Sequence, residues 1–394
     1  MTKRFQFSIL IVFNFLWVGA INAQSCNCSK DFDALDRLLQ KTPAYKDSKA
    51  TYQKTFQNLS SKLNTITSDY ECLVLLNKLA LAVNDNHINV FGMPESKGQY
   101  ITNTTISLDS LKQELSKRPF TDIEGVYKLP SYVTLGVYKH NQDYIGIILE
   151  SELENWNAGE IMYTLVPYGE DLMLAIFGQQ KNKRMVAVSE RIKNGMFLKL
   201  GLRKHQDIKP YHLAPSRDSL FIRKELNDKT TYIKAGSFDS FYPVLSDAEA
   251  FYKTLENSLS KENLIVDLRD NTGGGERNSD VLLEILTQYS ASNNMFVLIN
   301  HNTASNAEQF AVKLKKLPNT KILGDKTQGT LTYELKKNIS NPLPCKKFVA
   351  IITSKRHKEY LPFESVGVAP DMYLKYDSDW IEQAVKIINR QLKY

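Results

Sequence analysis

The sequence predicts an α/β protein with a helical N-terminal region and an inserted β-rich domain ahead of its main core. Three observations support this fold class. Apolar residues recur at helical spacing over 30–84, and short β-rich runs separated by turn signals fill 120–235. Strands alternate with helices from Thr230 onward. The predicted divisions are a signal peptide 1–23, a helical region 24–95, a β-rich domain 96–228 and a core 229–394.

The composition is that of a globular chain. Its 394 residues are 42% hydrophobic and 24% charged, and 50 Lys+Arg against 43 Asp+Glu give a formal net charge of +7. This excludes a disordered chain and allows two or three domains. The basic cluster Lys181, Lys183 and Arg184 is interpreted as a solvated turn, so we expect no nucleic-acid partner.

Residues 1–23 have the pattern of a secretory signal. Lys3 and Arg4 precede an apolar stretch that is too short to span a bilayer, and Ala20 to Ala23 offers small residues for cleavage. We expect an exported protein, periplasmic or secreted, with no transmembrane segment after signal removal. A buried N-terminal helix and a lipid anchor at Cys26 are the alternatives.

The cysteines fit an oxidising compartment. Cys26 or Cys28 paired with Cys72 would attach the N-terminus to the first helical region, and Cys345 is the fourth cysteine. The Cys-Asn-Cys run lacks the second pair of a zinc site, and the chain has no His-Glu-x-x-His motif. No metal is therefore expected.

The first two regions follow from periodicity. Apolar positions within 32–39 and 73–83 repeat at helical spacing, with polar residues between the two groups. In the β-rich domain, turn signals such as Asn157-Ala-Gly159 separate short runs, which is typical of an antiparallel barrel or sandwich. The expected strands are 132–138, 144–149, 160–166, 172–177, 185–189 and 196–200.

The core is predicted as strands and helices in alternation. Strands are expected at 232–236, 264–268, 295–300, 321–324 and 347–353. Helices are expected at 247–260, 280–288, 305–317 and 379–392. This alternation is typical of crossover units in a parallel sheet.

The first junction with residues suited to chemistry lies after the apolar strand 264–268. The chain runs there into Gly273, Gly274 and Gly275, whose N–H groups can point at a ligand. A nucleotide-binding motif is absent, because Asn278 fills the last glycine position of G-x-G-x-x-G and no G-x-x-x-x-G-K-[ST] occurs. The alternative is a simple tight turn.

The second junction is Thr303-Ala-Ser-Asn-Ala-Glu308. Ser305 and Glu308 have the spacing of a capping box, which starts a helix without any catalysis, and the local sequence favours this interpretation. The functional alternative is a serine nucleophile at a strand-to-helix turn, where the free N–H groups of the helix stabilise an oxyanion.

Four motifs that occur in order along the chain favour the nucleophile over the simple helix cap. Asp267 to Gly274, Thr303 to Glu308, Gly324-Asp-Lys-Thr-Gln-Gly329 and Gly367-Val-Ala-Pro-Asp371 resemble the tail-specific (C-terminal processing) and tricorn-core serine peptidases. The resemblance covers residues 230–374. It implies a ClpP/crotonase-like spiral of βαβ units and an endopeptidase with a polypeptide substrate. It implies no metal and no organic cofactor.

The same resemblance implies the site residues. Ser305 falls on the nucleophile, and Gly273, Gly274 and Asn306 fall on the backbone donors of the oxyanion hole. One branch of the family uses a lysine base, but Thr330 stands in its place, and Lys326 across the turn is a poor substitute.

The tricorn-like branch instead uses a histidine base, which implies His87 in Asp85-Asn86-His87. Glu364 then falls on the carboxylate that orients the imidazole. Asp85 is expected to be a loop or cap residue, and His301 an ordinary loop histidine. Asp267 and Arg269 are expected to brace the glycine turn.

A non-catalytic protein is the main rival interpretation. Asn86 replaces a glycine of the family pattern, Asn306 replaces the commoner alanine, and residues 100–230 lack the glycine loop of a PDZ domain. In this rival, the β-rich domain binds a peptide, glycan or lipid on a peptidase-like frame. A purely structural scaffold is the third possibility. The sequence predicts no particular oligomeric state.

Overall fold

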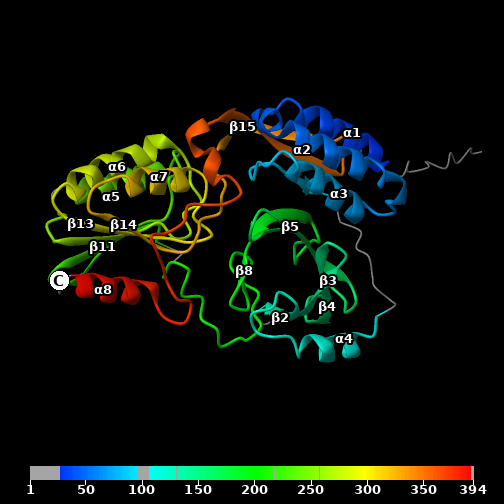
Figure 1. Cartoon of the computed structure of the whole chain (residues 1–394), viewed down its shortest axis with the longest axis horizontal. Helices are drawn as coiled ribbons and strands as arrows, with labels where there is room; N and C mark the ends of the chain where they lie inside the picture. The colour runs from blue at the N-terminus through cyan, green and yellow to red at the C-terminus, as the bar shows by residue number, and fades with distance from the viewer. Residues whose placement is uncertain (1–26, 96–105, 130–131, 216–218, 257, 392–394) are drawn as a thin grey trace, which may run out of the picture.

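The computed structural model describes residues 27–95, 106–129, 132–215, 219–256 and 258–391 (Figure 1). The predicted signal peptide and Cys26 lie outside these residues. The described chain forms an N-terminal helical region, a β-rich sheet and an α/β core, as the sequence predicts. None of the described helices is both long and apolar enough to cross a bilayer.

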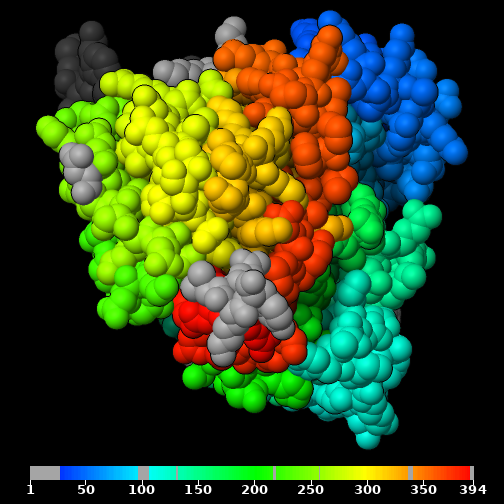
Figure 2. Space-filling view, turned by 60° about the vertical axis from the view of Figure 1, so that its left-hand side comes forward, coloured from blue at the N-terminus to red at the C-terminus, as the bar shows by residue number. Residues whose placement is uncertain are grey.

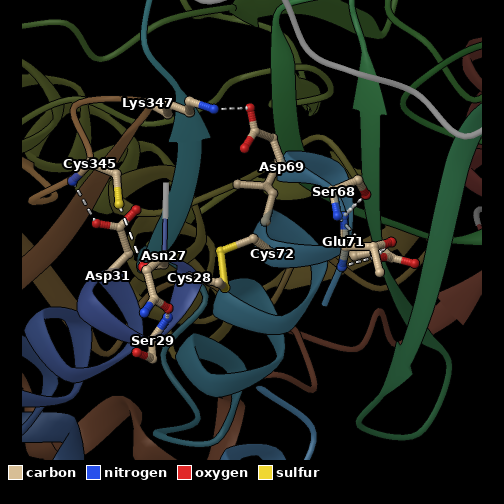
Figure 3. Close-up of a disulfide and its surroundings, with 12 residues drawn as sticks. Asn27, Cys28, Ser29, Asp31, Ser68, Asp69, Glu71, Cys72, Cys345 and Lys347 are labelled. Carbon is tan, nitrogen blue, oxygen red and sulfur yellow. Dashed lines mark hydrogen bonds and ion pairs between the residues drawn. A yellow bond between two sulfur atoms is a disulfide. The ribbon is translucent and has the colours of Figure 1, made fainter. Parts of the chain in front are cut away.

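Three helices form the N-terminal region, and each begins at a polar cap. They are α1 (Cys28–Leu39), α2 (Pro43–Ser60) and α3 (Asp69–Leu81). Thr42 caps α2, and Ser68 forms a capping box with Glu71 at α3. A disulfide between Cys28 and Cys72 joins α1 to α3 (Figure 3), which is one of the two pairings expected.

The β-rich part is a six-stranded antiparallel meander. Its strand order is β2-β3-β4-β5-β6-β7. Single bridges join Lys128 of β2 to Arg203, and Arg203 to Met196 in the hairpin that follows β7, so the outer edge of β2 is also paired. This is consistent with the barrel- or sandwich-like domain that the sequence predicts. The strands are β2 (Gly125–Leu129), β3 (Val133–His140), β4 (Asp143–Ser151), β5 (Ile161–Tyr168), β6 (Leu172–Gly178) and β7 (Met185–Glu190). Helix α4 (Leu108–Leu115) packs beside it, and β8 (Ile192–Lys193) pairs with β9 (Met196–Phe197).

Both faces of the meander are covered by apolar side chains. Val166, Leu174 and Ile176 share one hydrophobic cluster with the N-terminal helices. Trp156 and Tyr163 lie in a second cluster within the β-rich part. A sheet that buries one face against helices gains apolar contact there without a second sheet.

The core is a six-stranded sheet of order β10-β11-β12-β13-β14-β17. Every neighbouring pair is parallel except β10 with β11. Helices α5, α6 and α7 pack on one face and α8 on the other (Figure 1). The elements are β10 (Phe221–Asn227), β11 (Thr230–Ala235), α5 (Val244–Leu255), β12 (Asn263–Asp267), α6 (Glu276–Ser290), β13 (Asn294–Ile299), α7 (Asn306–Lys315), β14 (Thr320–Gly324), β17 (Met372–Tyr373) and α8 (Trp380–Gln391).

A small antiparallel sheet connects the N-terminal region with the core. Its order is β1-β16-β15, with β1 (Asn89–Gly92), β15 (Tyr333–Pro342) and β16 (Phe348–Arg356). Figure 2 shows this orange segment between the core helices and the blue N-terminal helices. Because β1 pairs with β16, the turn just before β1 lies against the loops of the core.

Candidate active site

The loops that follow three parallel strands meet at one edge of the core sheet. Strands β12, β13 and β14 are followed by residues 268–275, 300–305 and 325–329. Parallel neighbours end at the same edge, so the glycine loop, the Ser305 turn and the Thr327-Gln-Gly329 loop come together there. The turn containing Asp85, Asn86 and His87 approaches from the N-terminal region.

Ser305 stands at the head of α7 in a left-handed backbone conformation, with φ 56° and ψ −126°. This conformation is rare for a residue with a side chain and is held only where neighbours enforce it. The capping box is present, because the Glu308 carboxylate accepts the N–H of Ser305 at 2.9 Å. The hydroxyl also lies 3.2 Å from the Nε2 atom of His87. The serine therefore starts the helix and faces an imidazole.

His87 reaches Ser305 across 218 positions of sequence. Burial lowers the pKa of His87 to about 4, so the ring is neutral at pH 7 and can accept a proton. When Nε2 faces the hydroxyl as acceptor, Nδ1 carries the hydrogen. Nδ1 is buried and has no hydrogen-bond partner among the described residues. The Oδ1 atom of Asp85 lies 3.9 Å from Nδ1, which is beyond hydrogen-bond distance.

Glu364 does not orient the imidazole directly. Its carboxylate accepts the backbone N–H groups of Asn86 at 2.9 Å, Leu331 at 3.2 Å and Thr332 at 2.9 Å. No hydrogen bond or ion pair joins it to the His87 ring in the described part of the chain. The predicted contact between Glu364 and the imidazole is therefore not formed. Three backbone N–H groups bind the Glu364 carboxylate, and one of them belongs to Asn86, the residue before His87.

Asp85 is a buried carboxyl group next to the base, a closer role than the loop or cap expected. Its Oδ1 accepts the backbone N–H of His87 at 2.9 Å, and its Oδ2 accepts the hydroxyl of Thr353 at 2.6 Å. Burial, together with the nearby charge of Glu364, raises the pKa of Asp85 to about 8. The spacing Asp-x-His was the available signal, since it fits a carboxylate that folds back onto the turn.

The glycine loop packs directly against the serine turn. A side-chain carbon at Gly273 would lie 2.9 Å from the Cβ of Ser305, and one at Gly274 only 1.9 Å from the Phe238 carbonyl oxygen. The N–H of Gly273 donates to the Asn271 side chain at 2.9 Å, so Gly273 is removed from the predicted donors. The N–H groups of Gly274 and Asn306 donate to no hydrogen bond within the described residues.

The remaining candidates lie elsewhere. Lys326 pairs with Glu170 at 2.9 Å, away from Ser305. His301 is fully buried rather than an ordinary loop histidine, with Nδ1 3.2 Å from the Arg191 guanidinium. Arg269 and Asp267 form a buried ion pair at 2.6 Å beside the glycine loop, as expected. Within the described residues, no group of three or more His, Cys, Asp or Glu side chains is arranged to hold a metal ion.

The arrangement brings together an alcohol, a neutral imidazole and two unused N–H groups at a helix start. Such a set can deprotonate the alcohol and stabilise an oxyanion. Sequence reasoning found the alcohol, the imidazole and the N–H groups, but it did not predict that the carboxylates of Asp85 and Glu364 accept backbone N–H groups. These bonds depend on which backbone groups the fold leaves unpaired.

Comparison with known proteins confirms the family resemblance. Residues 275–374 match the model of peptidase family S41, which supports a serine-type peptidase. No curated protein sequence matches the chain.

Several solved structures are similar at low identity. A putative peptidase from Parabacteroides merdae is 15% identical, with 92% of this chain and 96% of that chain covered and a TM-score of 0.43. Mature CPAF is 13% identical, with 92% and 96% covered and a TM-score of 0.46. The photosystem II D1 C-terminal processing protease is 13% identical, with 92% and 97% covered and a TM-score of 0.39.

Proposed function

We propose that this chain, whose residues 275–374 match peptidase family S41, hydrolyses peptide bonds with Ser305 as nucleophile and His87 as general base. The observation that carries the proposal is the 3.2 Å separation between Ser305 Oγ and His87 Nε2, joined from two distant parts of the chain. That distance is within reach for proton transfer in an enzyme without substrate.

In the proposed reaction, Ser305 Oγ attacks the peptide carbonyl carbon while His87 Nε2 takes the hydroxyl proton. The imidazolium then gives this proton to the departing amine, and an acyl-enzyme ester remains. Water, deprotonated by the same ring, attacks the ester, and the carboxylic acid product leaves as Ser305 is restored. No group beyond the chain and water is needed to balance these steps.

The N–H groups of Gly274 and Asn306 are the proposed oxyanion donors. Asn306 directly follows Ser305, and Gly274 directly follows Gly273, which packs against the Ser305 side chain. Both N–H groups are free of other described hydrogen bonds, and Asn306 begins α7, whose N-terminus adds a partial positive charge. Loss of one such donor typically raises the barrier by about 2.7–4 kcal/mol. Glu364 is assigned to the backbone of Asn86, so the proposed arrangement is a serine–histidine pair with indirect carboxylate support.

Export remains part of the proposal. Residues 1–23 have the signal pattern, and the Cys28–Cys72 disulfide is of the kind that persists in oxidising compartments. We infer a periplasmic or secreted location on these two grounds.

The test is labelling with a fluorophosphonate probe together with cleavage of a peptide library. We expect label on Ser305, and a loss of kcat of at least about 10³-fold in Ser305→Ala with unchanged melting temperature. Undiminished cleavage in Ser305→Ala rejects the assigned nucleophile. A protein that neither labels nor cleaves, but binds a ligand through the meander, supports the non-catalytic rival.

A further inference from the structure

Four successive backbone N–H groups of the segment Gly329–Thr332 point at two buried glutamates. Those of Gly329 and Thr330 donate to Glu308 at 2.7 and 2.8 Å. Those of Leu331 and Thr332 donate to Glu364 at 3.2 and 2.9 Å. The segment therefore runs between two carboxylates, and each carboxylate takes one half of it.

Each glutamate also holds one end of the catalytic pair. Glu308 accepts the N–H of Ser305 at 2.9 Å, and Glu364 accepts the N–H of Asn86, next to His87, at 2.9 Å. A third link closes the arrangement, because the Asn86 side-chain amide donates to the carbonyl oxygen of Gly329 at 2.7 Å. Nucleophile and base are thus tied to the same four-residue segment from opposite sides.

The chemistry of these bonds makes them rigid. Glu308 is fully buried and Glu364 is 4% exposed. Every backbone group that is hydrogen-bonded to their carboxylates is an N–H donor. Burial raises the pKa of both glutamates, to about 7 for Glu308, and the ionised form is the one that accepts all of these N–H groups. In that form the bonds are charge-assisted, which makes them shorter and stronger than neutral ones, and they strengthen further away from water. The left-handed backbone of Ser305 needs such enforcement, because an unrestrained residue would leave that conformation.

We propose that Glu308 and Glu364, acting through the backbone of Gly329–Thr332, jointly set the separation of Ser305 and His87. Both are positioning residues: neither touches the reacting atoms, and each fixes one partner against a common strip of backbone. The proposal rests on the proposed function, since it names the residues that hold that site. It differs from a direct triad, in which Glu364 alone would act on the imidazole ring.

The test uses Glu308→Gln, Glu364→Gln and the double variant, with Asp31→Asn as a control. Asp31 is likewise fully buried and accepts a backbone N–H group, that of Cys345, at 2.9 Å. It lies in α1, and neither Asp31 nor Cys345 belongs to the serine turn or the histidine turn. Each amide substitution keeps the shape of the side chain and turns one acceptor oxygen into a donor.

We expect kcat for a peptide substrate to fall about 10–100-fold in each active-site variant, with KM within twofold, because misplacement of reacting groups by ångström fractions acts on kcat. The double variant should lose less than the product of the single losses, since both act on one segment. Asp31→Asn should lower the melting temperature and leave kcat within twofold. The acid limb of the kcat/KM profile should keep its midpoint in all variants.

Two results overturn the proposal. One is a Glu308→Gln variant whose kcat is as high as that of Asp31→Asn. The other is Glu364→Gln with a shifted acid midpoint, which would mean that the carboxylate acts on the ring itself. Wild-type protein that neither cleaves peptides nor labels at Ser305 overturns the proposed function and this inference together. If the wild-type protein cleaves peptides and Glu308→Gln has the same kcat, the inference is overturned and the proposed function is not.

Discussion

The α/β core and the β-rich meander each contain a six-stranded sheet, yet of these two only the core contributes candidate catalytic residues, Ser305 among them, while His87 comes from the N-terminal region. In the core, neighbouring strands run parallel, so the loops after β12, β13 and β14 gather at one edge. In the meander, consecutive antiparallel strands place successive turns at alternate ends. The comparison teaches that strand direction, more than the amount of sheet, concentrates chemistry-bearing loops.

One buried side chain at the end of the meander supports the site. The Arg191 guanidinium, which follows β7, donates to the carbonyl oxygens of Lys326 and Thr327 on the loop before Gly329, and to that of Val366. It also pairs with Asp171 at 2.9 Å. The two sheets thus differ in kind of contribution: the core supplies the reacting serine and the oxyanion donors, and the meander supports a loop that holds them.

The largest difference should come from exchanging His87, on the N-terminal turn that meets the core, and His140, in the meander. His87→Gln removes the proposed base, and we expect kcat to fall at least about 10³-fold. His140→Gln changes an exposed residue at the end of β3, and kcat should stay within twofold. Steady-state peptide hydrolysis measures both. Equal losses in the two variants would remove the distinction between the regions.

A smaller effect is expected from cutting the link between them. Arg191→Met keeps much of the side-chain length but removes the donor to three carbonyl oxygens, of which the Thr327 contact is buried and the other two are partly buried. A buried acceptor left without its donor costs about 1–3 kcal/mol. We expect kcat to fall about tenfold as the loop shifts, with a lower melting temperature. Arg203→Met is the control, since its guanidinium donates to the Ile208 carbonyl away from the site. If the kcat of Arg191→Met equals that of Arg203→Met, the Arg191 contact plays no part in holding the loop.

The smallest effect is expected from moderate acid. A general base works when it is neutral, and burial lowers the pKa of His87 to about 4. As pH falls from 7 to 5 the His87 ring stays neutral, so protonation of His87 should change kcat/KM less than twofold in this range; below pH 4 it should lower kcat/KM about tenfold per unit. A pH profile with a midpoint near 6.5 would show that the ring is solvated in the working enzyme, and the buried geometry would not apply.

The core was largely predictable from sequence because its strands are buried on both faces and its helices carry one apolar side. Strand β12 was expected at 264–268 and lies at Asn263–Asp267. Strands β10 and β15 were missed. Phe221–Asn227 is mostly exposed or half-buried at a sheet edge, and Tyr333–Pro342 is rich in polar residues, so neither shows the apolar run of a core strand.

The candidate site was predictable as to residue type and less so as to bonding. Ser305 and His87 followed from ordered motifs, and the structure brings them together. The direct action of Glu364 and the donor role of Gly273 did not follow, because each depends on which backbone groups the fold has already paired. Glu308 looked like a helix cap, and its bonds to a loop about twenty residues later have no local signal.

The hydrogen bond between the Asn86 N–H and Glu364 spans 278 positions, which affects when the site can form during protein synthesis. A ribosome delivers residue 86 early and residue 364 near the end, so the base cannot be seated until almost the whole polypeptide has emerged. A nascent or truncated chain therefore lacks an assembled centre, and the cell that makes this protein is spared hydrolysis by incomplete copies.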